Sequence, residues 1–82
     1  MRREPITIAD AAVRLGRQER TVRTWASRYR ARRLVESRKV GKTAWYDWHD
    51  LSTIGRCLRL GEPVPATADE RDELRAALFA AA

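Results

Sequence analysis

Two apolar stripes of helical period lie on either side of Gly16, and this pattern constrains the fold more than any other feature of the chain. Apolar residues recur three and four positions apart in residues 8–15 and again in residues 22–29, which predicts two amphipathic helices. The stripe residues are Ile8, Ala11, Ala12 and Leu15 in the first helix, and Val22, Trp25, Ala26 and Tyr29 in the second. Two helices joined by a few residues around a glycine are typical of a helix-turn-helix.

The ends of both helices are also marked in the sequence. Thr7 precedes Asp10 by three residues, which is a variant of the capping box that starts a helix. Gly16 can adopt the positive φ at which many helices stop. We therefore expect a first helix from Thr7 to about Leu15 and a second helix over residues 18–29.

Residues 34–48 change to the period of two that is typical of β-strands, with β-favouring residues after Gly41. A two-residue loop with glycine first fits a type II′ turn, so we expect a hairpin whose tip holds this glycine. The pairs in that register are Ser37 with Tyr46 and Arg38 with Trp45, the second placed for a cation–π contact.

A third helix and a short C-terminal helix complete the predicted elements. Asp47 and Asp50 resemble a second capping box, and an apolar stripe continues from there to Gly61. Residues 62–66 contain two prolines and form a stiff linker, after which we expect a fourth helix. The stripe residues are Leu51, Ile54, Gly55 and Leu58 in the third helix, and Leu74, Leu78 and Ala81 in the fourth.

With 82 residues the chain can bury one compact core. The predicted fold is mainly α with a small β-hairpin wing. It consists of a winged helix-turn-helix domain over residues 1–61, a Pro-containing linker over residues 62–66 and the C-terminal helix over residues 67–82.

Positive charge is concentrated between Arg17 and Lys42. This stretch holds ten Lys or Arg residues and two Glu residues, a net charge of +8, whereas the whole chain carries +6. Such a block favours a polyanionic partner, and double-stranded DNA is the partner that we expect. The fourth helix is acidic, so we do not expect it to contact DNA.

The composition argues against several other classes of protein. Cys57 is the only cysteine, which rules out an internal disulfide, and we expect no metal or other cofactor. No apolar run is long enough for a signal peptide or a membrane span, which predicts a cytoplasmic protein. The sequence has no phosphate-binding loop and no Ser/His/Asp arrangement, so we expect no enzymatic activity.

The motifs resemble those of phage excisionases, which are small winged-helix proteins related to the MerR-type regulators. The similar parts are the threonine-apolar-acidic-Ala-Ala opening and Leu-Gly turn of residues 6–16, and the Thr-Val-x-x-Trp helix of residues 20–25. Residues 40–42 are similar to the family's wing tip, and residues 50–51 to the start of its last helix. The resemblance covers roughly residues 5–61. It implies a protein that binds and bends DNA beside attachment sites and assists an integrase without performing the strand chemistry.

Three groups of residues are candidates for DNA contact. A helix-turn-helix normally places the exposed side of its second helix in the major groove. A wing can reach the minor groove or the adjoining backbone, and arginines beside the recognition helix can hold phosphates. The candidates are Arg20, Arg23, Thr24 and Arg28 on the recognition helix, Arg38, Lys39, Lys42 and Thr43 on the wing, and Arg17, Arg30, Arg32 and Arg33 at phosphates.

Each of these assignments has a structural alternative. Arginines on an exposed helix face are often only solvated, and Arg20 and Arg23 could contact either base edges or phosphates. Lys39 and Lys42 could instead form a charged edge that resists aggregation. The residues that we expect to be structural or solvated are Trp25, Tyr46, His49 and Cys57.

Three functions remain open at this point. The leading prediction is an excisionase, or recombination directionality factor, that binds and bends attachment-site DNA to direct excision by a tyrosine integrase. A small phage or bacterial transcriptional repressor would use the same fold. The third class is a protein-interaction adaptor whose basic surface meets an acidic protein.

The fourth helix could serve any of these functions in one of three ways, because an isolated helix this short is marginal in water. It could fold back over the third helix, or it could fray. It could also contact the integrase or a neighbouring copy of the chain on DNA, through Leu74, Leu78 and Ala81.

Overall fold

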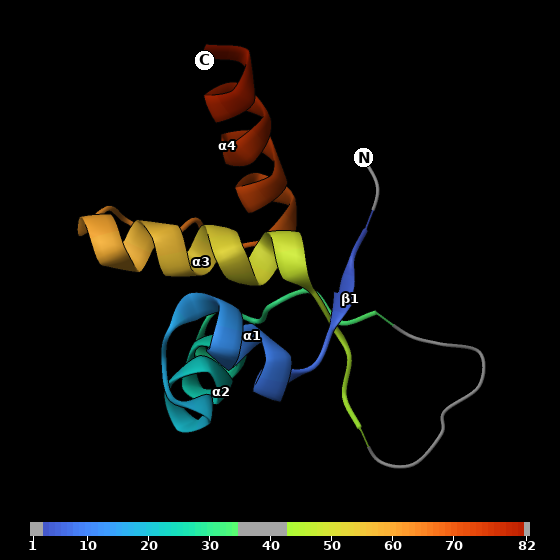
Figure 1. The fold of residues 1–82 in the computed structure, drawn as a ribbon. Helices are drawn as coiled ribbons and strands as arrows, with labels where there is room; N and C mark the ends of the chain where they lie inside the picture. The colour runs from blue at the N-terminus through green and yellow to red at the C-terminus, as the bar shows by residue number, and fades with distance from the viewer. Residues whose placement is uncertain (1–2, 35–42, 82) are drawn as a thin grey trace.

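The structure is a computed structural model that describes residues 3–34 and 43–81. Its elements are β1 (Pro5–Ile6), α1 (Ile8–Leu15), α2 (Glu19–Arg28), β2 (Tyr46–Asp47), α3 (Trp48–Leu60) and α4 (Ala68–Ala81). The described part is mainly helical, as the sequence predicts, and contains a small antiparallel sheet of β1 and β2 (Figure 1). The predicted wing tip around Gly41 lies outside the described residues.

The helix ends form where the capping residues predict them. The Thr7 hydroxyl oxygen accepts a hydrogen bond from the Asp10 N–H at 3.2 Å, and Gly16 ends α1 with a φ of 65°. Asp47 caps α3 by accepting from the His49 N–H at 3.2 Å. The second helix is one residue shorter at each end than predicted, and Gln18 makes no side-chain cap bond there.

The core lies where α1, α2 and α3 meet. The buried apolar residues are Ile6, Ile8, Ala11, Ala12, Val22, Ala26, Ala31, Leu51, Ile54 and Cys57. Leu15, Trp25, Tyr29, Tyr46, Trp48, Leu58 and Val64 are partly buried against them. The three helical stripes predicted up to Leu58 are therefore confirmed as packing faces.

Gly55 lets α3 approach the other two helices closely. A Cβ atom at this position would lie 3.1 Å from a Leu15 methyl carbon and 3.5 Å from the Trp25 ring. Glycine is therefore needed here for space, because its φ does not lie in the left-handed region.

The sheet corrects the predicted hairpin register. Tyr46 pairs with Ile6 of β1 on one side and with Arg33 on the other. The Leu34 N–H donates to the Trp45 carbonyl and the Asp47 N–H to the Arg32 carbonyl, both at 2.9 Å. The predicted pairing of Ser37 with Tyr46 is therefore wrong. The long-range contact with β1 sets the position of Tyr46, and a local turn rule does not include that contact. Arg38, with its predicted contact to Trp45, lies outside the described residues.

The C-terminal helix packs on α3, and of its predicted apolar stripe only Leu74 is half-buried. The buried residues of α4 are Arg71 and Arg75, whereas Leu78 is 37% exposed and Ala81 is also exposed. The reason is a buried carboxylate on α3, which needs a cation beside it. Figure 1 shows the last turns of α4 projecting away from the other helices.

Candidate nucleic-acid interface

The exposed face of α2 carries the four recognition-helix candidates. Arg20, Arg23, Thr24 and Arg28 are all exposed, while Val22 and Ala26 on the opposite face are fully buried or nearly so. None of the three arginines forms an ion pair with any residue in the described ranges. The Thr24 hydroxyl donates to the Arg20 carbonyl at 3.0 Å. Within residues 3–34 and 43–81, the three arginines of this face are thus not neutralised by an ion pair.

A cleft joins this face to the chain that leaves the predicted wing. It has a volume of about 390 Å³, and its walls include Glu19 and Arg23 of α2 together with Thr43, Ala44 and Tyr46. The cleft therefore brings together two predicted DNA-contacting residues, Arg23 of the recognition helix and Thr43 of the wing. The wing candidates Arg38, Lys39 and Lys42 lie outside the described residues.

The four phosphate candidates occupy different environments. Arg17, Arg30 and Arg33 are exposed, and the Arg33 guanidinium lies 5.9 Å from the centre of the Tyr46 ring. Arg32 is half-buried, and one of its terminal nitrogens lies 2.7 Å from an Asp69 oxygen and 3.1 Å from an Asp72 oxygen. Its charge is therefore already neutralised by α4, unlike that of the other three arginines.

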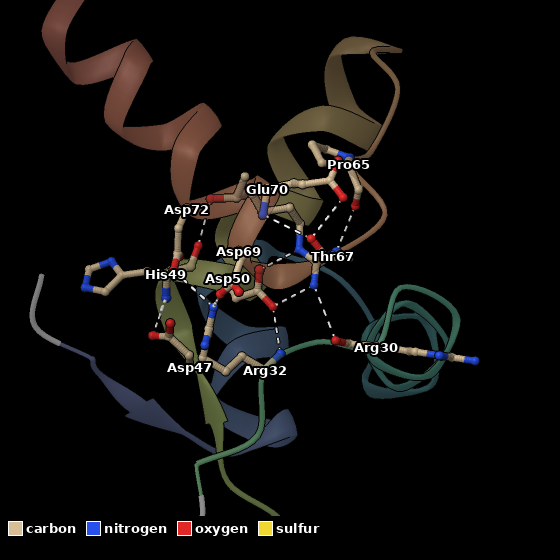
Figure 2. A network of polar contacts seen from close by, with 12 residues as sticks. Arg30, Arg32, Asp47, His49, Asp50, Pro65, Thr67, Asp69, Glu70 and Asp72 are labelled. Atoms are coloured by element: carbon tan, nitrogen blue, oxygen red, sulfur yellow. Dashed lines mark hydrogen bonds and ion pairs between the residues drawn. The ribbon is translucent and has the colours of Figure 1, made fainter.

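Arg71 is the centre of a network that joins α4 to the rest of the fold, and Figure 2 labels its partners Arg30, Asp50 and Pro65. Its side chain is fully buried and donates to both carboxylate oxygens of Asp50, at 2.5 Å and 2.9 Å. It also donates to the Pro65 carbonyl at 2.8 Å and to the Arg30 carbonyl at 3.3 Å. The same Asp50 carboxylate accepts from the Arg32 N–H at 2.7 Å. One buried pair thus fixes the backbone just after the end of α2.

Arg30 occupies a strained position at this point. Its φ is 49°, a left-handed value that glycine usually takes. Figure 2 shows its carbonyl turned toward the network and its side chain turned away from it. The hydrogen bond from Arg71 to this carbonyl therefore supports the turn, while the Arg30 guanidinium stays exposed beside α2.

The network extends to the N-terminal strand through Arg3. The Arg3 guanidinium lies 2.9 Å from Asp72 of α4 and 3.3 Å from Asp47 at the start of α3. The hydrogen bond with Asp72 raises the pKa of Arg3. The hydrogen bond from Arg32 holds the pKa of Asp69 below its usual range. The acidic residues of α4 therefore act mainly on neighbouring arginines.

Sequence reasoning did not identify Arg71 or Asp50 as a buried pair. The predicted capping box paired Asp47 with Asp50; Asp47 caps the helix as predicted, whereas Asp50 faces inward. Arg71 lies among acidic residues of a short helix, where an arginine is usually solvated. The pair joins positions 21 residues apart, so no local pattern reports it.

The remaining sequence predictions concern aromatic and polar side chains. Trp25 and Tyr46 pack against the core, as expected. Cys57 is buried, and burial raises the pKa of its thiol. The His49 side chain is half-buried, and its backbone carbonyl accepts hydrogen bonds from Ser52 and Thr53.

Two further kinds of site were sought in the part of the chain that the structure describes. There, no group of three His, Cys, Asp or Glu side chains is placed to hold a metal ion. In the same residues, no helix combines the length and apolar character needed to cross a membrane. Comparison with protein-family models, with curated proteins and with solved structures finds no match to this chain.

Proposed function

We propose that this protein binds double-stranded DNA as a winged helix-turn-helix, with the exposed face of α2 in the major groove. The observation that carries the proposal is the set of unneutralised arginines on that face, Arg20, Arg23 and Arg28. A solvated face of a small protein commonly intersperses both signs of charge, whereas this face carries three arginines and one carboxylate, Glu19, at its N-terminal end. A polyanion is the ligand that it fits best.

The cleft beside α2 supports the same orientation. Arg23 and Thr43 line it from two sides, so a duplex lying on α2 would also meet the segment that returns from residues 35–42. Arg17, Arg30 and Arg33 are exposed and could hold phosphates on either side of the groove. Arg32 is set aside from this group, because Asp69 and Asp72 already bind its guanidinium.

Selection of binding sequences from a random duplex library tests the proposal at physiological salt. We expect enrichment of one sequence, and Arg23→Ala should weaken the preference for it. Arg59→Ala, an exposed arginine on α3, is the matched control and should preserve it. If no sequence is enriched, the protein does not recognise a specific DNA sequence. If it binds no DNA at all, the proposal is wrong and the protein-interaction adaptor is the function that remains.

The finer proposal, an excisionase, rests on the motifs of residues 6–16 and 20–25 described above. An excisionase bends its site, so the enriched sequence should show anomalous mobility when its position in a fragment is permuted. In a purified reaction with a tyrosine integrase and its attachment-site DNA, the protein should promote excision. A protein that occupies its own promoter and leaves excision unchanged would be the repressor.

A further inference from the structure

A second cationic surface lies on the flank where α1 and α3 meet. It is a hollow of about 330 Å³ whose rim carries Arg14, Arg17, Arg56 and Arg59, and whose lining includes Trp25 and Trp48. None of these residues lines the cleft beside Arg23 and Thr43. The hollow is therefore a separate feature of the surface.

The lining of the hollow is aromatic and open. Both indoles are half-buried, and both pack against the core. The Arg14 guanidinium lies 5.0 Å from the centre of the Trp48 ring and forms one wall. Leu15 and Gly55 complete the apolar part of the lining, and a Leu15 methyl carbon would lie 3.1 Å from a Cβ atom at Gly55.

The rim is only partly neutralised. Arg14 pairs with Glu4 at 3.2 Å and Arg56 with Glu62 at 3.7 Å, in both cases between exposed side chains. Arg17 and Arg59 form no ion pair with any residue in the ranges 3–34 and 43–81. Among the described residues, the guanidinium groups of Arg17 and Arg59 thus have no carboxylate partner, and they line the same hollow as the two indoles.

The position of the hollow argues against duplex DNA as its ligand. Arg20, Arg23 and Arg28 do not line it, and α2 contributes only Trp25, which belongs to the packed stripe of that helix. A sugar-phosphate backbone uses guanidinium groups and has no side chain to insert between indoles. An acidic peptide with an apolar side chain matches both the rim and the floor.

We propose that this hollow binds an acidic peptide segment of a partner protein, which packs an apolar side chain against Trp25 and Trp48. A carboxylate of the segment pairs with Arg59, while Arg17 stays available to a DNA phosphate. Because DNA on the exposed face of α2 leaves the hollow open, the protein can hold DNA and the partner together. The peptide site goes beyond DNA binding and does not depend on it.

The test uses a nine-residue probe peptide with a central Leu-Phe pair flanked by glutamates, titrated into the full ¹⁵N-labelled chain without DNA. We expect the indole N–H signals of Trp25 and Trp48 to shift, while that of Trp45, which does not line the hollow, stays in place. Probes with lysines for the glutamates, or serines for the Leu-Phe pair, should leave both signals unshifted.

Matched charge reversals locate the site. Arg59→Glu should weaken peptide binding about three- to tenfold, since it replaces an attraction with a repulsion at the rim. Arg28→Glu makes the same change on the face of α2 and should leave peptide binding unchanged. Equal losses in the two variants, or unshifted indole signals at millimolar peptide, would overturn the proposal.

A parallel experiment with DNA as the ligand distinguishes a failure of this proposal from a failure of the proposed function. A duplex of the enriched sequence should leave the Trp48 signal in place, and Arg59→Glu should weaken DNA binding far less than Arg28→Glu. If Arg59→Glu instead lowers the affinity for DNA and for the peptide by the same factor, the hollow belongs to the nucleic-acid surface and the peptide assignment is wrong. A failure of DNA binding alone would leave the peptide result standing.

Discussion

Arg71 and Asp50 form an ion pair in which both side chains are fully buried, and this pair joins α4 to the first turn of α3. Asp50 also accepts from the Arg32 N–H, and Arg71 donates to the Arg30 carbonyl. The pair therefore holds the chain at the point where the recognition helix ends and the stem of the wing begins. A buried pair adds little net stability over apolar packing, but the loss of one partner leaves an uncompensated charge.

Arg71→Met should lower the free energy of unfolding by about 3–5 kcal/mol, because it leaves the Asp50 carboxylate buried without its cation. Chemical denaturation followed by circular dichroism measures this change. Arg59→Met, at an exposed position on α3, should change stability by no more than about 0.5 kcal/mol. The double variant Asp50→Asn/Arg71→Met removes the buried charge and should be more stable than Arg71→Met. If it is not, the buried charge is not the cause of the loss.

Affinity for duplex DNA should fall steeply with salt. If four to six arginines and lysines contact phosphates, the slope of log K against log salt concentration is about −4 to −5 per monomer. Fluorescence anisotropy with a labelled duplex between low and physiological salt gives this slope directly. A slope near zero would contradict DNA binding through the basic surface, and Arg33→Ala should reduce the slope by about 1 if Arg33 holds a phosphate.

Arg23→Ala should reduce the discrimination between the enriched sequence and random DNA by about 1–3 kcal/mol if Arg23 reads a base edge. The side chain lies on the exposed face of α2 and lines the cleft shared with Thr43, where a base edge in the groove would be met. Competition binding with the two duplexes measures the difference. Arg17→Ala should lower the affinity for both duplexes by the same factor. If Arg23→Ala does the same, Arg23 contacts a phosphate and not a base edge.

The hydrogen bond from Arg32 should govern the titration of Asp69. This bond lowers the pKa of Asp69 in the folded protein, so its stabilising effect is present above the unfolded pKa of about 3.9 and is lost as pH falls through the lower folded value. Carbon-detected NMR of the side-chain carboxyl should show a titration midpoint that rises toward 3.9 in Arg32→Gln. Arg33→Gln alters a neighbour with no contact to Asp69 and should leave the midpoint in place. An unchanged midpoint in Arg32→Gln would mean that the ion pair does not form in solution.

The parts of the fold that follow local rules could be predicted from the sequence. The caps at Thr7 and Asp47 and the glycine at position 16 act within a few residues, and each lies at the predicted helix end. The apolar stripes of the first three helices also follow from helical period alone, and they form the core. The exposure of the α2 arginines follows from the same period, so this part of the candidate site could be found without coordinates.

The parts that depend on long-range partners could not be predicted in this way. The strand register is set by β1, which lies 41 residues before the strand that it pairs with. The packing face of α4 is set by the Asp50 carboxylate, and Arg32 is removed from the phosphate group by Asp69 and Asp72. In each case a residue's role depends on a charge or a backbone group that lies far away in sequence.

The contact between Arg3 and Asp72 has a consequence for the order of folding. It joins positions 69 residues apart, whereas the Thr7 cap of α1 spans only three. Closing a long loop costs more chain entropy than closing a short one, so this contact forms only after α4 has docked. We therefore expect this contact to be absent from the transition state for folding. Asp72→Asn should therefore accelerate unfolding and leave the folding rate nearly unchanged in stopped-flow measurements.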